Sequence, residues 1–118
     1  MQIGIVAGEA SGDFLGAQLM SSLLNRMPSL QFAGIGGPRM QSLGLDSWYP
    51  MERLAVRGYV EVIRHYAGLV AMRARLKARL LAAKPAIFIG VDAPDFNLAL
   101  EAGLRRNRIP AVHYVSPS

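Results

Sequence analysis

The fold is decided by the stretch Ala86-Ile87-Phe88-Ile89-Gly90-Val91-Asp92-Ala93-Pro94-Asp95-Phe96-Asn97. Its first six residues form a short apolar run typical of a buried parallel strand, and the acid and proline that follow are typical of the start of a helix. In open α/β sheets the ligand crevice lies at the carboxyl ends of the strands, so the pattern places Asp92 where chemistry usually occurs. A carboxylate there can act as a general base, a metal ligand or a helix cap.

The same alternation of short apolar runs and helical patterns extends along the whole chain. Strands are predicted at Gln2–Ala7, Gln31–Ile35, 45–48, 86–91 and 111–115. Helices are predicted up to about Met27, briefly after 36–40, over much of Tyr59–Ala83 with Gly68 as a point of interruption, and over 96–106. This order predicts one α/β domain spanning 1–118, a Rossmann-like parallel sheet with helices on both faces.

The composition of the 118 residues narrows the class of protein. The chain has no cysteine, which excludes a disulfide scaffold and thiolate metal sites. It begins without a basic leader, and no stretch approaches the roughly 20 apolar residues of a membrane span. We therefore expect a protein that is soluble or peripherally attached to a membrane. The net charge of +5 is concentrated between 53 and 84, which suggests a polyanionic partner.

The loops that follow the predicted strands differ in chemistry from those that precede them. The helix-to-strand loops at 26–29, 82–85 and 106–110 are marked by proline and contain no carboxylate. The strand-to-helix loops carry Glu9, Ser11, Asp13, Arg39, Asp92, Asp95, Asn97 and Ser116. Right-handed βαβ connections place all loops of the second kind at one edge of the sheet, so that edge is the predicted functional edge.

Two interpretations of Asp92 remain open from the residues alone. Asp92 with Asp95 three positions later resembles a capping box, and proline suits the first turn of a helix. The alternative is a catalytic carboxylate. A metal pair is less favoured, because no histidine or further acid is nearby to complete an oxygen-rich set. We expect no metal site.

The two glycine-containing loops differ in the ligands that they suit. The loop at 8–13 lacks the spacing of a dinucleotide-binding loop, and its Glu9 and Ser11 suit sugar hydroxyls better than phosphate. Its Asp13 is most simply a helix cap. Gly36, Gly37 and Arg39 form a better candidate anion site, although an ordinary turn with a solvated arginine has the same pattern.

His113 and the long helix at Tyr59–Ala83 also allow two interpretations. His113 lies in a predicted strand, where a core histidine whose ring nitrogens are hydrogen-bonded is the default, but the Ser116 loop that follows leaves a site role open.

The second half of the long helix suits core packing through Leu76 and Leu80. Its first half is apolar on more than one face beside a row of arginines, a composition typical of an interfacial membrane helix or an acyl-chain contact. The residues predicted for this role are Val60, Val62, Ile63, Tyr66, Leu69 and Val70.

Five blocks of sequence together resemble the lipid-A-disaccharide synthase family of bacterial glycosyltransferases. They are Ala7-Gly8-Glu9-Ala10-Ser11-Gly12-Asp13, Gly34-Ile35-Gly36-Gly37-Pro38-Arg39-Met40, Gly58-Tyr59-Val60-Glu61-Val62, 91–97, and His113-Tyr114-Val115-Ser116-Pro117-Ser118. The blocks occur in the family's order and spacing. Arg57 departs from the pattern, since an apolar residue is expected there, and this bears on the depth of membrane insertion.

The resemblance implies a reaction and a set of roles. The family joins UDP-2,3-diacylglucosamine to 2,3-diacylglucosamine 1-phosphate with inversion, releasing UDP, and its essential aspartate corresponds to Asp92, the implied general base. Glu9 and Ser11 are assigned to the acceptor side, and Arg39 with the Gly36-Gly37 backbone to the acceptor phosphate. Substrate contacts are also expected from Asn97, His113 and Ser116.

The resemblance also implies surroundings for the chain. The family's proteins continue into a second lobe that holds the nucleotide, so the chain is expected to be the truncated N-terminal lobe of a GT-B enzyme, inactive by itself. We expect no cofactor, a cytoplasmic protein peripheral on the inner membrane, and a homodimer as an option for the full-length protein.

Two other functions stay open. One is a different nucleotide-sugar enzyme of the same architecture, such as another GT-B transferase or an epimerase. The other is a non-enzymatic module that binds anionic membrane or nucleic acid through the basic segment at 53–84. The absence of aromatic residues between the arginines at 73–79 argues against RNA or single-stranded DNA, so we expect no nucleic-acid partner.

Overall fold

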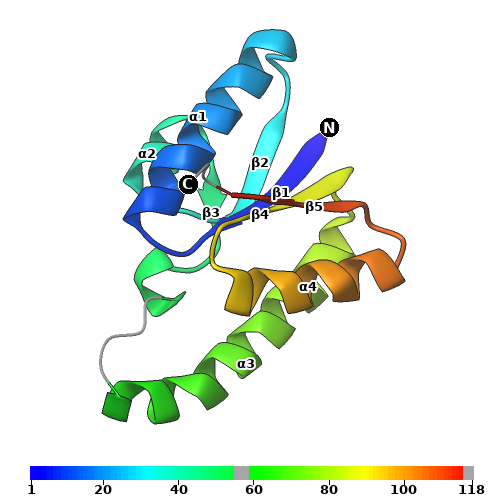
Figure 1. Cartoon of the computed structure of the whole chain (residues 1–118). Helices are drawn as coiled ribbons and strands as arrows, with labels where there is room; N and C mark the ends of the chain where they lie inside the picture. The colour runs from blue at the N-terminus through cyan, green and yellow to red at the C-terminus, as the bar shows by residue number, and fades with distance from the viewer. Residues whose placement is uncertain (55–58, 116–118) are drawn as a thin grey trace.

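The computed structural model describes residues 1–54 and 59–115, and the side-chain surroundings of all of these except 59–65. Five strands alternate with helices along the chain (Figure 1). In chain order the elements are β1 (Gln2–Ala7), α1 (Ala10–Arg26), β2 (Gln31–Ile35), α2 (Pro38–Ser42), β3 (Asp46–Ser47), the 3₁₀ helix η1 (Met51–Leu54), α3 (Tyr59–Ala83), β4 (Ile87–Val91), α4 (Pro94–Arg106) and β5 (Ala111–Tyr114).

All five strands are parallel and lie in the order β3-β2-β1-β4-β5. The chain winds outward from β1 in one direction to β3, then returns to β4 on the other side of β1. The point where the direction reverses, between β1 and β4, is the topological switch point at which such sheets bind ligands. Ala7 at the end of β1 pairs with Val91 at the end of β4, so the loops that follow these two strands leave the sheet side by side.

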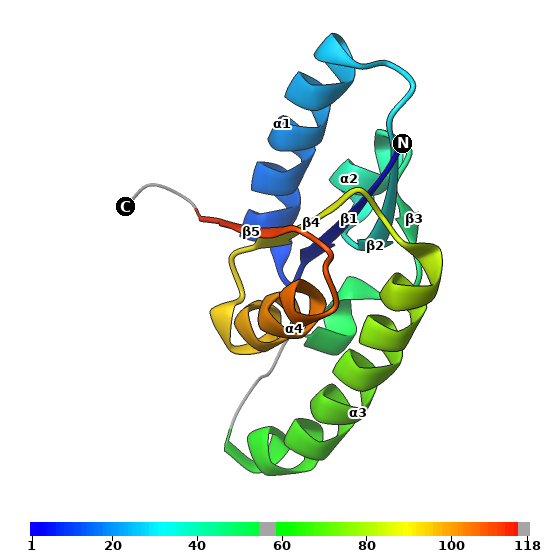
Figure 2. The same cartoon turned by 90° about the vertical axis from the view of Figure 1, so that its right-hand side faces the viewer.

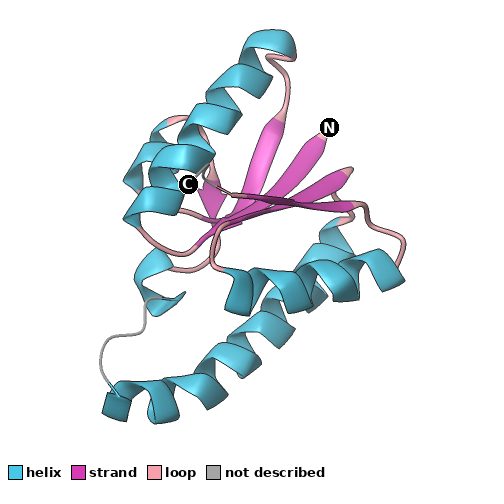
Figure 3. Cartoon of the chain, viewed as in Figure 1, coloured by secondary structure: helices cyan, strands magenta, loops and turns pink. Residues whose placement is uncertain are grey.

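The sheet is covered by helices on both faces, as Figures 2 and 3 show. One core packs α1 and α2 against residues such as Ile5 and Ile89, and the other packs α3 and α4 against Val6 and Phe88. Because successive strand residues point to opposite faces, continuous apolar runs fill both cores at once. The predicted α/β class with a Rossmann-like parallel sheet is confirmed.

Most predicted elements match the structure within a residue or two, and the differences are local. The helix α3 runs without interruption through Gly68. The helix α4 begins at Pro94, two residues earlier than predicted. Its N-cap is Ala93, with no side-chain hydrogen bond to the helix, so the capping-box interpretation of Asp92 and Asp95 is wrong. None of the described helices is long and apolar enough to cross a bilayer.

Candidate active site

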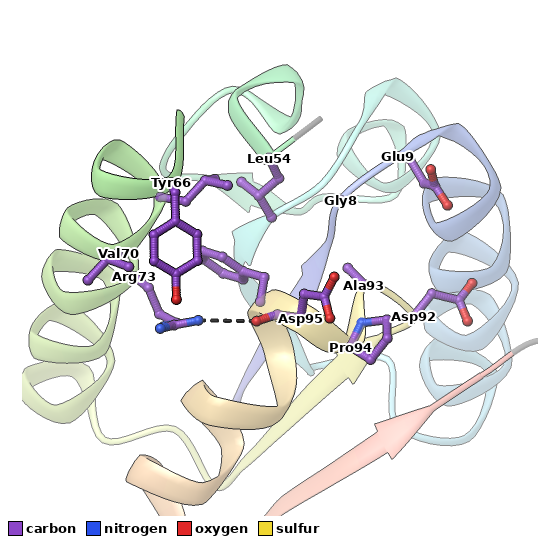
Figure 4. A pocket seen from close by; sticks show the side chains of 12 residues that line it. Gly8, Glu9, Leu54, Tyr66, Val70, Arg73, Asp92, Ala93, Pro94 and Asp95 are labelled. Carbon is purple, nitrogen blue, oxygen red and sulfur yellow. Dashed lines mark hydrogen bonds between the residues drawn. The ribbon is translucent and has the colours of Figure 1, made fainter. Parts of the chain in front are cut away.

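A cavity of about 830 Å³ opens at the switch point of the sheet. We call it the switch-point cavity. It is lined by Gly8 and Glu9 after β1, residues 92–96 after β4, Leu54 of η1, and Tyr66, Leu69, Val70 and Arg73 of α3. Figure 4 shows Glu9 and Asp92 on one side of the cavity and the α3 side chains on the other. Two of the predicted strand-to-helix loops therefore meet, as expected, around one hollow.

Asp92 stands on a sharp turn between β4 and α4. Asp92 and Ala93 both have left-handed backbone conformations, with φ values of 48° and 43°. Alanine avoids this region, whereas aspartate tolerates it better than most L-residues, and strain of the kind seen at Ala93 is found most often at functional sites. The Asp92 N–H donates to the carbonyl of Tyr114 at 2.9 Å, which ties the turn to the end of β5. The turn thus holds a half-buried carboxylate at the cavity wall.

The wall formed by α3 is apolar except for the Arg73 guanidinium and the Tyr66 hydroxyl. Tyr66 and Val70 are exposed, and the Arg73 guanidinium donates to the Asp95 carbonyl at 3.2 Å. It also lies 5.9 Å from the centre of the Phe96 ring. Arg73 therefore links α3 to the first turn of α4 across the cavity. Sequence reasoning missed Arg73, although its spacing of seven residues from Tyr66 on a helix places both on one face.

Asn97 lies beneath the cavity. Its side chain is fully buried, and its Nδ2 atom donates to the carbonyls of Val6, Val91 and Asp92 at 3.2, 3.4 and 3.0 Å. The substrate contact expected of Asn97 stays a prediction, since in this structure its side chain bonds only to the backbone of the chain. Its amide connects the ends of β1 and β4 to the turn that carries Asp92.

The predicted anion site at Gly36, Gly37 and Arg39 stays a prediction, and most of its backbone donors are already engaged within the chain. The buried carboxylate of Asp13, on α1, accepts hydrogen bonds from the backbone N–H groups of Gly37, Arg39 and Met40, each at 3.0 Å. We call this set of bonds the Asp13 clasp. Asp13 is a cap, as predicted, but it caps α2 and not its own helix. The Arg39 guanidinium lies 5.0 Å from the centre of the Phe14 ring. The backbone N–H groups of Gly37, Arg39 and Met40 are therefore occupied by a protein carboxylate, while the side chain of Arg39 is exposed.

The remaining predicted residues are placed apart from the cavity or beside its rim. The Ser11 hydroxyl donates to Glu9 Oε1 at 3.2 Å, and both side chains are exposed. His113 Nδ1 lies 2.7 Å from Oε2 of the buried Glu101, which supports the core interpretation of this histidine. Ser116 lies outside the described residues. The side chains of Val60, Val62 and Ile63 also lie outside them, although their backbone belongs to α3.

The chemistry of the switch-point cavity follows from its lining. Three carboxylates, from Glu9, Asp92 and Asp95, face an apolar wall and one arginine. Carboxylates of this kind accept protons and hydrogen bonds from hydroxyl groups, while the wall suits an acyl chain or a ring face. Among the residues with described side chains, no three His, Asp or Glu residues gather as a metal ion would need. The arrangement favours a hydroxyl-rich ligand with apolar parts and a carboxylate acting as the base.

The sequence matches a known family of proteins along nearly its whole length. The family model described as lipid-A-disaccharide synthetase matches residues 3–118. Lipid-A-disaccharide synthase of Chromobacterium violaceum is 56% identical over 118 residues, covering 100% of this chain and 31% of the relative. The synthases of Dechloromonas aromatica and Methylobacillus flagellatus are 53% and 55% identical, cover 100% and 98% of this chain, and are likewise covered to 31% of their own length. The chain thus spans about a third of the length of these relatives.

Proposed function

The chain belongs to the lipid-A-disaccharide synthetase family, and on that premise we propose that it supplies the acceptor site and general base of an inverting glycosyltransferase that makes the lipid A disaccharide. The observation that carries the proposal is the position of Asp92. Its carboxylate lines the switch-point cavity on a strained turn, where open α/β sheets bind their ligands.

The proposed reaction joins UDP-2,3-diacylglucosamine to 2,3-diacylglucosamine 1-phosphate. The acceptor's 6-hydroxyl attacks the anomeric carbon from the face opposite the UDP, its proton passes to the Asp92 carboxylate, and the bond to UDP breaks with its electron pair. The products are the β-1,6-linked disaccharide phosphate and UDP. A base that takes the proton as the bond forms typically contributes 10²–10⁴-fold to the rate.

The lining of the cavity supports a division of roles toward the acceptor. Glu9, with Ser11 beside it, offers oxygen atoms to sugar hydroxyls at the rim. Tyr66, Leu69 and Val70 offer an apolar surface for an acyl chain. We assign the nucleotide of the donor to the part of the family's length that this chain does not span.

An attachment to the cytoplasmic face of the inner membrane is part of the proposal. Tyr66 is 67% exposed and Val70 is 40% exposed, and Arg75 is exposed on the same helix. Apolar side chains flanked by arginines suit the boundary between headgroups and acyl chains of an anionic membrane. A substrate that carries acyl chains can then pass from the membrane into the cavity along α3.

The experiment uses a chimera in which this chain replaces the segment that it matches in the Chromobacterium violaceum synthase. We expect the chimera to form disaccharide, and Asp92→Asn to lower kcat by about 100-fold or more because the base is lost. Asp95→Asn is the matched control, since Asp95 lines the same cavity on the next turn and is assigned no proton transfer. Equal effects of the two substitutions, or full turnover by Asp92→Asn, would contradict the assignment.

Membrane attachment is tested separately with the isolated chain. Replacing Tyr66, Leu69 and Val70 together by serine should reduce sedimentation with vesicles of anionic phospholipid. Leu98→Ser is the control, because Leu98 is 48% exposed on α4 and away from the cavity lining. Binding that both variants retain in full would refute the attachment through α3.

The non-enzymatic alternative has less support. Three arginines of the basic segment lie against aromatic rings of the chain itself: Arg79 at 4.1 Å from Trp48, Arg53 at 5.8 Å from Tyr49, and Arg73 at 5.9 Å from Phe96. Guanidinium groups held in this way cover apolar surface of the domain as well as carrying charge.

A further inference from the structure

We propose that Asn97 is the positioning residue that fixes the Asp92 carboxylate for proton transfer. The inference rests on the proposed function, because it assigns Asn97 a role that acts through the base. It differs from a substrate contact, since the Asn97 side chain is fully buried beneath the cavity.

The geometry of the Asn97 amide carries the proposal. One nitrogen, Nδ2, lies 3.2 Å from the Val6 carbonyl, 3.4 Å from the Val91 carbonyl and 3.0 Å from the Asp92 carbonyl. Val6 belongs to β1, Val91 ends β4, and Asp92 begins the turn. A single side chain thus joins the two strands that flank the switch point to the residue assigned as base.

The Asp92 carbonyl lies just beyond the last paired residue of β4, where the sheet no longer supplies a regular partner. The turn leaves the regular hydrogen-bonding pattern of the sheet at Asp92, where the φ of 48° starts two consecutive left-handed residues. Buried backbone carbonyls are almost always paired in native proteins. The shortest of the three bonds goes to the carbonyl of Asp92 itself, so the amide holds the turn in the left-handed conformation that it adopts here.

The other amide atom indicates why asparagine occupies this position. Asn97 Oδ1 is buried and makes no hydrogen bond to any described residue. Three carbonyl acceptors around Nδ2 fix the orientation of the amide, because the opposite orientation would place oxygen against oxygen. A buried acceptor without a partner is unfavourable, and groups of this kind cluster where function limits the choice of residue. The Nδ2 donors of Asn97, and not its Oδ1 atom, therefore support the turn that carries Asp92.

The expected consequence of losing these donors is a misplaced base. A displacement of about 1 Å at a reacting group can lower a rate by about 100-fold. Substrate binding depends on the rim and on α3, which Asn97 does not contact through any described hydrogen bond. Loss of the amide should therefore lower kcat while leaving KM nearly unchanged.

The test is a double-mutant cycle in the chimera defined above. Asn97→Leu, similar in size but without donors, should lower kcat about 100-fold, with KM for both substrates within about 3-fold of the parent. In a chimera that already carries Asp92→Asn, the same substitution should lower kcat by less than about 3-fold, because there is no base left to position. Asn107→Leu is the matched control: its Nδ2 donates to the Gly103 carbonyl at 2.8 Å at the far end of α4, and we expect no change in kcat.

Each result separates the inference from the function on which it rests. A parent chimera without activity would contradict the proposed function. An active chimera in which Asn97→Leu leaves kcat unchanged, or lowers it equally with and without Asp92, would overturn the positioning role and leave the function standing. Asn97→Ser keeps one donor in a smaller side chain and is expected to lose about 10-fold in kcat, so it supplies the same cycle if Asn97→Leu does not fold. Thermal unfolding of the isolated chain reports folding for each variant.

Discussion

Two turns at the same edge of the sheet each join a buried strand to a helix that starts with proline. One of them is closed by a protein carboxylate, and the other lines a cavity. They are the turn between β2 and α2 and the turn between β4 and α4. In the first, a carboxylate from α1 fills the helix N-terminus and buries it as the Asp13 clasp. In the second, carboxylates line the switch-point cavity. A neighbouring side chain, and not the turn itself, decides which loop can meet a ligand.

The two turns also differ in backbone conformation, and only the turn at the cavity is strained. Gly37 has an extended conformation with φ of −90°, while Ala93 has φ of 43° and therefore carries strain. Proteins tolerate local strain at functional sites at the expense of stability. The comparison predicts that changes at the clasp destabilise the fold, whereas relief of strain at the cavity stabilises it.

The largest effect is expected for Asp13→Ala. The substitution leaves three backbone N–H groups at α2 without their acceptor, and should lower the free energy of unfolding by about 3 kcal/mol. Urea unfolding of the isolated chain measures it. Asp46→Ala is the control, because the exposed Asp46 accepts one bond, from Trp48 Nε1 at 3.2 Å. A loss below about 1 kcal/mol at Asp13 would show that the clasp is not structural.

A smaller loss is expected for Gly37→Ala. A Cβ atom at Gly37 would lie 2.6 Å from Asp13 Cγ, so the clasp must open or shift, and overpacking of this kind costs about 2 kcal/mol. Gly68→Ala provides a control with the opposite sign. Beyond its chain neighbours and the backbone of its own helix, no atom lies within 4 Å of a Cβ at Gly68, in the middle of α3, and the change should stabilise the chain by about 1 kcal/mol. The same loss at both glycines would refute close packing as the cause.

The smallest change is expected for Ala93→Gly, and it is a gain. Glycine adopts the left-handed conformation without the steric cost of Cβ, so the free energy of unfolding should rise by about 1 kcal/mol. The chimera should at the same time lose some turnover, because the turn beside Asp92 becomes looser. A destabilised Ala93→Gly variant would contradict the strain assigned to this turn, and equilibrium unfolding decides between the two results.

The extent to which sequence predicts this molecule depends on how local each feature is. The strands β1 and β2 have the predicted bounds, because an apolar run between turn residues specifies a buried strand by itself. The clasp escaped prediction because Asp13 reaches an N–H group 24 residues away, and Asn97 reaches a carbonyl 91 residues away. The left-handed turn was also not predicted, because its residues, Asp92 and Ala93, include no glycine. That residues 1–118 form a separate lobe stays a prediction.

We propose that the acceptor binds in the switch-point cavity and not at the turn before α2. The direct measurement is a titration of the isolated ¹⁵N-labelled chain with a short-chain, water-soluble diacylglucosamine 1-phosphate, followed by amide NMR shifts. We expect the shifts to change at Gly8, Glu9, Ala93 and Asp95, which line the cavity, and to stay constant at Gly37 and Met40 of the clasp. Changes confined to the clasp, with a silent cavity, would contradict the account.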